Sequence, residues 1–520
     1  MQGGPAELDM RPPWAWPGTL AVVSLAVLLR LPHLTNRSLW YDEASSWQTA
    51  AFSWSEMLKS LRLNVHLPLY YILLKGWVSG LGDSVASLRG FSVLFGGLTV
   101  LGMGLFAREV SQASCRDEGS ERDRERFALV VAAVIAISPF QVLGAVEARM
   151  YSLGTALTAF GSWLLLRIVN QGGRSWSWWA YAAISVCLLY THHYGAFTIV
   201  AQFVFLIVEV AILFGRAERE RAIVVLRGAV TVGVVMALAY LPGLMILRGQ
   251  VSRVRQDYWL PGLDQAKFLG SMSEFLIPTH GFDFPKVGLV VLAVGTASCS
   301  VLAIRGGSGN RFVLASALIP IGLAASISAV QPVWLARYLR FSHLFLLTGI
   351  VSAFWQLTAH APRRRAAATL ALLMVLSGAY VLFWHYLDIP NGQGVRGAVE
   401  VVLANKRDDE LIVTVDHHQH FPVKYYAGRT AEVRLVEPHP DLFWGWHLIR
   451  PDDLVTQGRL DEELKRGVWL IARNSDPAKA LDRADLTVLA RYEFRFYHAL
   501  HRRLFVYHVR TGSVPSTRER

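Results

Sequence analysis

Two adjacent acids, Asp42 and Glu43, lie in the stretch Leu39-Trp40-Tyr41-Asp42-Glu43-Ala44, shortly after a strongly apolar segment, residues 17–34. A charge at the centre of a bilayer costs roughly 3 kcal/mol or more, so acids this close to an apolar segment must face water or a partner. A carboxylate in that position can take a proton from a reacting hydroxyl group. The alternative is purely structural, because acids also stabilise the N-terminus of a helix.

Other polar residues recur where later apolar segments begin or end, and they include histidines, an acid and arginines. They are His66, Glu147, Arg149, His192, His193, Arg337 and Arg340. Arginine grips a phosphate through its planar fork and stays charged. The set therefore suits an anionic leaving group beside a hydroxyl that must lose its proton.

Each of these residues also has a structural interpretation. Glu147 and Arg149 could form an ion pair at a membrane interface. Arg337 and Arg340 could extend from a helix end toward the headgroups as anchors. The pair His192-His193 could be polar helix-end residues without a function.

The elements that must position these residues are membrane helices. The chain has 520 residues, a mean hydropathy of +0.34 and only 17% charged residues, against about a quarter in a soluble protein. Apolar windows near the ~20 residues that cross lipid lie at 17–34, 88–107, 127–145, 150–169, 177–191, 195–215, 228–247, 286–304, 312–330, 341–357 and 366–387. We therefore predict an α-helical polytopic membrane protein with about 11 transmembrane helices.

The net charge of +12 does not indicate a nucleic-acid partner, because lysine and arginine cluster in short loops between the apolar windows. Four loops are densely basic: 108–126, 216–227, 305–311 and 363–365. Basic loops face the cytoplasm, and these four do so together only if Leu67–Leu81 lies in the interface instead of crossing the bilayer. This topology places the N-terminus inside and the C-terminus outside. One basic loop, residues 248–267, does not fit the rule, because it would lie outside.

With this topology, the first external loop spans residues 35–87 and carries the acidic pair, and all the polar residues named above reach the external face. The composition changes near residue 388, where Pro390-Asn391-Gly392-Gln393-Gly394 is typical of a linker. We therefore divide the chain into a transmembrane catalytic domain, residues 1–390, and a small extracytoplasmic α/β domain, residues 391–520. In the second domain we expect helices at 395–404 and 421–427 and strands at 410–415, 467–472 and 504–508.

A sugar carried on a polyprenyl phosphate is a substrate for which both the arginines and the acids would have a role. Breaking the sugar–phosphate bond leaves charge on the phosphate, which fixed cations stabilise. A carboxylate on the opposite face of the sugar would accept the proton of the acceptor hydroxyl, which implies inversion at the anomeric carbon.

Five short motifs occur in order: Leu39-Trp40-Tyr41-Asp42-Glu43-Ala44, His66-Leu67-Pro68-Leu69-Tyr70-Tyr71, Glu147-Ala148-Arg149-Met150-Tyr151, Thr191-His192-His193-Tyr194 and Ala336-Arg337-Tyr338-Leu339. In order and sidedness they resemble the GT-C glycosyltransferases of the protein O-mannosyltransferase and aminoarabinose-transferase (ArnT-like) superfamily, over roughly residues 15–390. The resemblance implies a polyprenyl-phosphate-sugar donor, an extracytoplasmic active site and a juxtamembrane helix at Leu67–Leu81.

Carried onto this chain, the resemblance makes Asp42 the general base and Glu43 its neighbour in positioning a substrate. The residues expected to hold the donor phosphate are Arg149, Arg337, Tyr338 and His66, and those expected to contact a substrate more weakly are Glu147, Tyr151, His192 and His193. Related enzymes often have a histidine before a Pro-Pro pair, whereas Leu67-Pro68 follows His66 here.

A last cluster, Asp416-His417-His418-Gln419-His420, follows a predicted strand and offers four potential metal ligands. Adjacent ligands on one loop seldom share one site. We therefore expect a solvated loop that faces the headgroups, with a divalent metal as the alternative. The predicted reaction requires no cofactor.

These observations predict a glycosyltransferase of a bacterial inner or plasma membrane that moves a hexose or pentose from polyprenyl phosphate to an extracytoplasmic acceptor. The alternative is a lipid or sugar transporter or flippase without transferase activity. Such proteins usually carry midplane charges and two related halves, which this sequence does not show. A membrane sensor is a third class, but eleven spans exceed what an anchor needs. The sequence identifies neither the sugar nor the acceptor.

Overall fold

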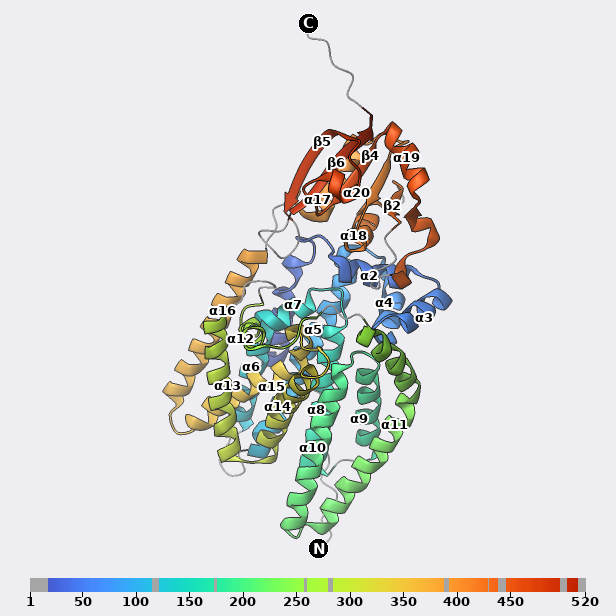
Figure 1. Ribbon diagram of the computed structural model, residues 1–520. Helices are drawn as coiled ribbons and strands as arrows, with labels where there is room; N and C mark the ends of the chain where they lie inside the picture. The colour runs from blue at the N-terminus through green and yellow to red at the C-terminus, as the bar shows by residue number, and fades with distance from the viewer. Residues whose placement is uncertain are drawn as a thin grey trace.

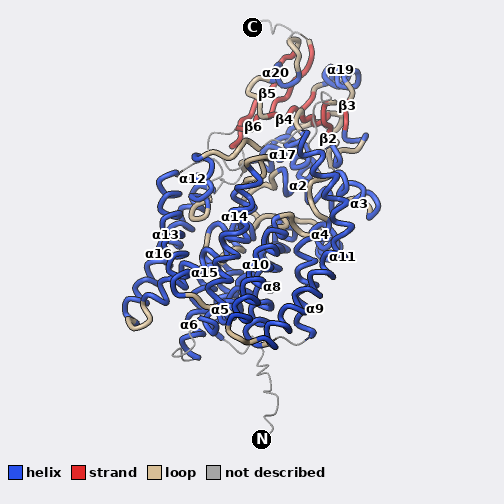
Figure 2. Tube along the Cα trace, turned by 60° about the horizontal axis from the view of Figure 1, so that its bottom comes forward, coloured by secondary structure: helices blue, strands red, loops and turns tan. Residues whose placement is uncertain are grey.

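The computed structural model describes residues 17–114, 121–172, 175–256, 260–278, 284–387, 392–428, 430–437, 446–495 and 503–512. A bundle of long helices carries a small sheet domain at one end, and helices α2 (Tyr41–Ala51), α3 (Trp54–Leu63) and α4 (Pro68–Leu81) lie between the two (Figure 1). The strands are confined to that end, and the rest of the described chain is helical apart from its connections (Figure 2).

The helices of the bundle follow the apolar windows of the sequence. Their bounds are α1 (Pro17–Leu28), α5 (Val85–Ser114), α6 (Glu121–Ile137), α7 (Pro139–Ala145), α8 (Tyr151–Gln171), α9 (Ser175–Leu189), α10 (Tyr194–Gly215), α11 (Arg219–Gln256), α12 (Gln265–Glu274), α13 (Pro285–Arg305), α14 (Ser308–Ser328), α15 (Arg340–Leu357) and α16 (Pro362–Leu387). With α6 and α7 counted together and α12 left out, eleven helical segments match the eleven predicted windows. Seven helices in the described ranges are each long and apolar enough to cross a membrane, and the α6–α7 pair makes an eighth. The chain is therefore an integral membrane protein.

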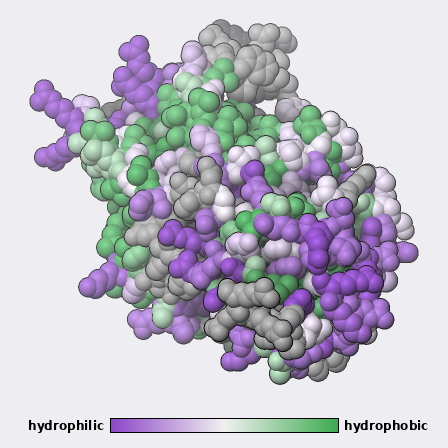
Figure 3. Space-filling model, turned by 90° about the horizontal axis from the view of Figure 1, so that it is seen from above, coloured by the Kyte–Doolittle hydropathy of each residue, from purple (hydrophilic) through white to green (hydrophobic). Residues whose placement is uncertain are grey.

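Lipid-facing side chains identify the surface of the bundle. Most of the exposed large apolar residues in the described ranges lie on α10, α11, α13 and α16, where solvent would make such exposure costly. Viewed from the sheet end, polar side chains cover most of the near face, and apolar side chains gather toward one flank (Figure 3).

A bend between α6 and α7 brings the chain toward the sheet end of the bundle. The two helices meet at 65° across Ser138. Pro139 follows it, and a proline disfavours the helical conformation of the preceding residue, which here has ψ of +117°. The connection that follows α7, residues 146–150, is buried and contains two of the predicted site residues.

The window Leu67–Leu81 forms helix α4 beside α2 and α3, at the end of the bundle that carries the sheet (Figure 1). Pro68 occupies its first turn, where the missing N–H costs nothing. The helix buries Tyr70, Tyr71 and Leu74 in a cluster that also contains Phe421 and Leu448 of the C-terminal domain. The short helices and the C-terminal domain therefore share one apolar core.

The C-terminal domain is a six-stranded sheet with helices on both faces. Its elements are α17 (Gly394–Asn405), β1 (Leu411–Thr414), α18 (His417–Ala427), β2 (Val433–Val436), β3 (Leu454–Val455), α19 (Gln457–Arg466), β4 (Val468–Ala472), α20 (Pro477–Leu481), β5 (Leu486–Arg495) and β6 (Arg503–Thr511). The strand order is β3-β2-β1-β4-β6-β5, in which the first four strands are parallel and β6 pairs antiparallel with β4 and β5.

Alternation along β1 explains the two layers of helices. Ile412 packs with α17 and α18 on one face, and Leu411 and Val413 pack with α19 on the other. The predicted α/β class is confirmed, and each of the five elements expected in this domain coincides with an observed one. The sequence patterns missed β2, β3, β5, α19 and α20. Two residues of the predicted linker, Pro390 and Asn391, lie outside the described residues.

Candidate active site

Asp42 lies in the first turn of α2, and the sequence explains why the helix begins there. Trp40 is the N-cap residue with extended backbone, and Glu43, three positions on, accepts a hydrogen bond from the Trp40 N–H at 3.4 Å. The structural interpretation of the acidic pair therefore holds for Glu43. Asp42 has a different environment, because its side chain is 20% exposed and faces two arginines.

The Asp42 carboxylate lies between two guanidinium groups from distant parts of the chain. Its Oδ2 atom is 3.8 Å from Arg149 Nη2 and 3.5 Å from Arg337 Nη1. Arg149 comes from the connection between α7 and α8, and Arg337 comes from the short helix η3 (Ala336–Leu339), 295 positions after Asp42. The structure thus brings together the predicted base and both arginines predicted to bind phosphate.

Arg149 is held by a set of buried oxygens and one histidine. Its Nη1 atom donates to the Asp42 carbonyl at 3.1 Å and to Ser46 Oγ at 3.2 Å, and its side chain is 2% exposed. Nη2 lies 2.9 Å from His66 Nε2, so that nitrogen must be the acceptor. These contacts fix one edge of the guanidinium plane while Nη2 still reaches Asp42.

His66 supplies no positive charge to this site. Burial lowers the pKa of His66 well below its ordinary value, and the neighbouring Arg149 lowers it further. A neutral imidazole that accepts from Arg149 orients the arginine instead of neutralising a phosphate. We therefore reassign His66 from phosphate binding to the positioning of Arg149.

Arg337 is more open than Arg149 and is surrounded by aromatic rings. Its Cζ atom lies 5.4 Å from the centre of the Trp40 ring and 6.0 Å from that of Tyr338, and its side chain is 15% exposed. Stacking of this kind holds a guanidinium without using up its hydrogen-bond donors. Arg337 is therefore the cation of the pair that an arriving anion can reach.

Glu43 points away from Asp42 and into the protein. Its oxygens accept from Arg89 Nε and Nη2, both at 2.7 Å, and from the Ala148 N–H at 2.9 Å, and neither side chain of the Glu43–Arg89 pair is exposed. Burial alone would raise the pKa of Glu43, but Arg89 outweighs it and the pKa is lowered. The expectation that Glu43 contacts a substrate is not supported, because its oxygens are occupied and enclosed.

The Glu43–Arg89 pair joins the segments that carry the site. Arg89 also donates to the carbonyls of Leu34, Arg37 and Ser38, which precede α2. The N–H of Ala148, directly before Arg149, completes the set. The pair thus fixes the start of α2 relative to the connection that carries Arg149.

Glu147, Tyr151 and Arg340 lie beneath the site and are almost fully buried. Burial raises the pKa of Glu147, and the positive charge of Arg340 opposes this shift. Arg340 Nη1 donates to the Phe140 carbonyl at 2.7 Å, and its Cζ lies 5.4 Å from the Tyr151 ring. The interpretation of Arg340 as an anchor extending to the headgroups is wrong, because the side chain is enclosed.

The two histidines before α10 have separate surroundings. His192 is buried, its Nδ1 accepts from the Tyr194 N–H at 3.1 Å, and its ring centre lies 5.1 Å from that of Tyr338. Burial lowers the pKa of His192 well below its ordinary value, so it is neutral. His193 Nε2 donates to the Val65 carbonyl at 3.2 Å. His192 supports the Tyr338 ring, and His193 supports the loop that carries His66.

Several residues of the site had no place in the sequence-based prediction. Arg89 lies at the start of an apolar window, residues 88–107. A charged residue inside an apolar segment is rare, and this could have identified Arg89 as part of the site. Trp40 and Tyr71 lay in quoted motifs, and Ser46 gave no signal because serine is common on any helix. Tyr71 OH lies 3.5 Å from Arg149 Nη1.

The histidine-rich segment after β1 is not a solvated loop. Asp416 is the N-cap of α18 and accepts from the His418 N–H at 2.8 Å, and His417 and His420 are buried. The helix packs on α2, so the cluster lies against Tyr41 instead of the headgroups.

An apolar cavity of about 760 Å³ lies among α12, α13, α14, α15 and α16. Phe268, Met272 and Phe275 line one part of it and pack in the same apolar cluster as Ala336 and Tyr338. Other lining residues, on α13 and α16, belong to the exposed apolar surface of the bundle. The cavity therefore extends from the lipid-facing flank to side chains that pack in the same apolar cluster as η3.

Comparisons with known proteins support the fold of this chain. No family model and no curated protein sequence matches it. Among solved structures, ArnT from Cupriavidus metallidurans bound to undecaprenyl phosphate superposes with a TM-score of 0.57 at 13% identity, covering 94% of this chain and 97% of that one. The apo state of the same protein gives a TM-score of 0.55 at 13% identity over the same shares. The Archaeoglobus fulgidus oligosaccharyltransferase in complex with Zn and sulfate matches 80% of this chain and 62% of that one, at 12% identity and a TM-score of 0.48.

The chain has the ArnT-like fold over 94% of its length. The predicted resemblance to GT-C glycosyltransferases is confirmed for the fold.

Proposed function

We propose that the protein is a membrane glycosyltransferase that moves a monosaccharide from a polyprenyl-phosphate donor to an extracytoplasmic acceptor. One observation carries this proposal: a partly exposed carboxylate, Asp42, lies within 4 Å of two guanidinium groups, Arg149 and Arg337. A base beside two fixed cations is what a displacement at a sugar phosphate needs.

The two arginines bind the donor phosphate in this proposal. Arg149 is rigidly held by Ser46, His66 and the backbone, so it offers a fixed charge at the site. Arg337 is more exposed and stacks on Trp40, so it can turn toward an arriving anion. Together they stabilise the charge that develops on the phosphate as its bond to the sugar breaks.

Binding of the donor also prepares Asp42 as the base. Without a donor, the Asp42 carboxylate is the counter-ion of both arginines. A phosphate that takes over these arginines leaves the carboxylate with less positive charge around it. The carboxylate is then released from these ion pairs and can accept the proton of the acceptor hydroxyl.

The reaction is a single displacement, in which Asp42 accepts the proton and the two arginines stabilise the charge of the leaving phosphate. The acceptor oxygen forms a bond to the anomeric carbon while the bond from that carbon to the phosphate oxygen breaks. The hydroxyl proton passes to Asp42, and the polyprenyl phosphate leaves with its charge opposite Arg149 and Arg337. Attack opposite the leaving group inverts the anomeric configuration.

The apolar cavity among α12–α16 offers space for the lipid part of the donor. Its wall includes residues that pack beside η3, which carries Arg337. A polyprenyl chain in this cavity would present its phosphate to the arginine end of the site. The structural neighbour ArnT was crystallised bound to undecaprenyl phosphate, which supports a lipid phosphate of this class.

The distribution of basic loops supports an external active site. The α10–α11 and α13–α14 connections lie at the end of the bundle opposite the sheet (Figure 1). Their arginines include Arg216, Arg219 and Arg305, which the positive-inside rule assigns to the cytoplasm. The site and the C-terminal domain then lie outside a bacterial inner or plasma membrane.

The test is donor turnover by the full chain reconstituted in liposomes with a panel of polyprenyl-phosphate hexoses and pentoses. Release of polyprenyl phosphate from one donor is expected for the wild type and is expected to be lost in Asp42→Asn. A matched control is Asp83→Asn, which changes an acid outside the site that contacts Trp47. Lipid translocation without sugar release would overturn the proposal in favour of a transporter. Full turnover by Asp42→Asn would overturn the assignment of Asp42 as the base.

A further inference from the structure

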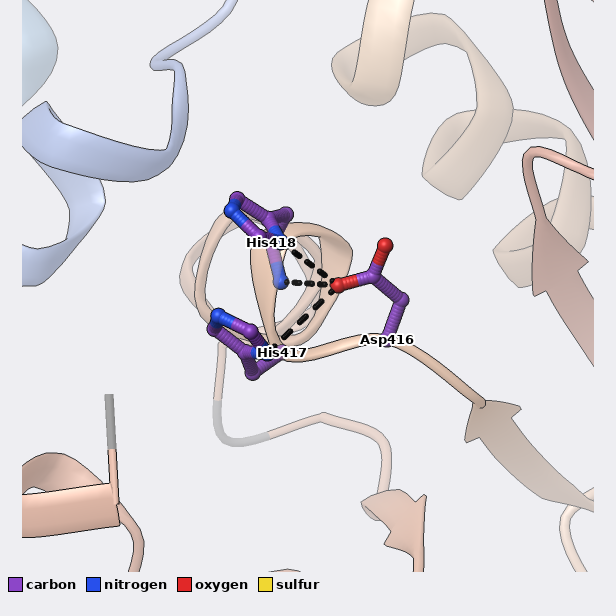
Figure 4. A group of neighbouring side chains, drawn as sticks. All are labelled: Asp416, His417 and His418. Atoms are coloured by element: carbon purple, nitrogen blue, oxygen red, sulfur yellow. Dashed lines mark hydrogen bonds and ion pairs between the residues drawn. The ribbon is translucent and has the colours of Figure 1, made fainter. Parts of the chain in front are cut away.

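Outside the candidate active site, one cluster in the described ranges has the composition of a metal centre. Asp416, His417 and His418 lie at the junction between β1 and α18 (Figure 4). One ligand atom from each residue lies within 4.8 Å of the other two. The carboxylate Oδ1 is 2.7 Å from His418 Nδ1 and 3.6 Å from His417 Nδ1. Ligands around a tetrahedral Zn²⁺ lie about 3.3 Å apart, so these atoms are already near the required spacing.

His417 is a buried polar side chain whose ring nitrogens have no hydrogen-bond partner. Its side chain is 5% exposed, and neither ring nitrogen makes a hydrogen bond. Burying such a group without a partner is unfavourable.

The cluster lies where α/β sheets bind ligands. From β1 the chain moves to β2 and β3 on one side and then returns to β4 on the other, so the order of strands reverses between β1 and β4. Ligands of open α/β sheets bind outside the carboxyl ends of the strands at such a point. Asp416 follows β1, and Arg473, which pairs with the other oxygen of Asp416, follows β4.

The cluster also contacts the helix that carries the candidate base. The ring centre of Tyr41 lies 4.6 Å from that of His418 and 5.3 Å from that of His417. Tyr41 is the first residue of α2 and immediately precedes Asp42. Any ion that orders the two histidines therefore restrains the start of α2.

We propose that Asp416, His417 and His418 bind a divalent transition-metal ion of the Zn²⁺ class. Two imidazoles and one carboxylate form a ligand set that suits Zn²⁺, and three protein ligands leave a fourth position for water or substrate. Arg473 orients the carboxylate from its other oxygen. The ion joins the C-terminal domain to α2 by fixing the rings against which Tyr41 packs. This assignment does not depend on the reaction that the protein catalyses.

The test uses the full chain in detergent, purified without a histidine tag and stripped of metal with a chelator. Calorimetric titration with Zn²⁺ is expected to give one ion per chain, and Co²⁺ is expected to give the visible absorption of a four-coordinate site. His418→Ala is the main variant, because this side chain is 43% exposed and its loss leaves the core intact. We expect it to weaken Zn²⁺ binding more than about tenfold.

The matched control is His360→Ala, which removes an exposed imidazole from the turn between α15 and α16. It is expected to bind Zn²⁺ like the wild type. Zn²⁺ is also expected to raise the unfolding temperature of the wild type and of this control, but not that of His418→Ala. The proposal is wrong if the wild type shows no saturable binding, or if His418→Ala binds Zn²⁺ as tightly as the wild type.

Discussion

Replacing Glu43 with glutamine should destabilise the protein, whereas replacing Asp42 with asparagine should not. The Glu43–Arg89 pair is fully enclosed and bidentate, so solvent does not screen it. Removing one partner of such a pair leaves an uncompensated charge and costs about 3–5 kcal/mol. At about 2 °C per kcal/mol for a large domain, the unfolding temperature falls by roughly 6–10 °C.

Asp42 is partly exposed, and Arg149 keeps its contacts to Ser46, His66 and the backbone without it. Asp42→Asn should therefore cost about 1 kcal/mol or less of stability. It removes the proposed base and should abolish turnover while the donor still binds. These two isosteric changes at adjacent positions thus distinguish the acid that stabilises the fold, Glu43, from the acid that takes part in the reaction, Asp42.

The assay combines thermal unfolding in detergent with donor turnover at a temperature where both variants are folded. A structural role for Glu43 is excluded if Glu43→Gln unfolds at the wild-type temperature and loses only turnover, because Glu43 would then act on a substrate. A purely chemical role for Asp42 is excluded if Asp42→Asn is destabilised as much as Glu43→Gln, because Asp42 would then be a second structural acid.

Three further outcomes follow from particular contacts. Arg337→Lys keeps the positive charge but loses the planar guanidinium that binds a phosphate through two hydrogen bonds. The KM for the donor should therefore rise about tenfold, equivalent to about 1.4 kcal/mol, with little change in the unfolding temperature. An unchanged KM would exclude Arg337 from the donor site. Tyr426→Phe removes the hydroxyl that accepts a hydrogen bond from the buried Leu39 N–H at 2.8 Å. It should cost about 1–3 kcal/mol of stability, measured as a lower unfolding temperature. An unfolding temperature equal to that of the wild type would show that the C-terminal domain does not hold the acidic motif in place. The pKa of Glu43 is lowered in the folded state, so its contribution to stability is present above the ordinary carboxyl pKa and is lost as the pH falls through the lowered value. Unfolding temperatures measured from pH 6 to pH 3 should therefore fall more steeply for the wild type than for Glu43→Gln, and parallel curves would contradict this reasoning.

Sequence patterns were sufficient where the physical signal is local. A run of apolar residues crosses lipid whatever its neighbours are, so eleven helical segments could be located from hydropathy windows. The single window 127–145 overlooked the break between α6 and α7, although Pro139 is a local signal for it, because a proline acts on the residue beside it. Short motifs also identified Asp42, Arg149 and Arg337 as residues that belong together.

The sequence could not assign separate roles to Asp42 and Glu43. Both are acids in the same helical turn, and only the packing of α5 against the start of α2 turns Glu43 toward Arg89 and leaves Asp42 facing the other two arginines. His66 is a similar case, because its neutral state follows from burial and from Arg149, 83 positions away.

The histidine-rich segment after β1 shows the same limit in the C-terminal domain. Its composition suggested a solvated loop, but the docking of α18 on α2 buries His417 and presses the cluster against Tyr41. The sequence by itself determined which segments enter the membrane and which side chains can carry charge, because hydropathy and side-chain chemistry belong to each residue. The tertiary structure alone decided which charges meet and which are enclosed, because burial and pairing depend on residues that are far apart in the chain.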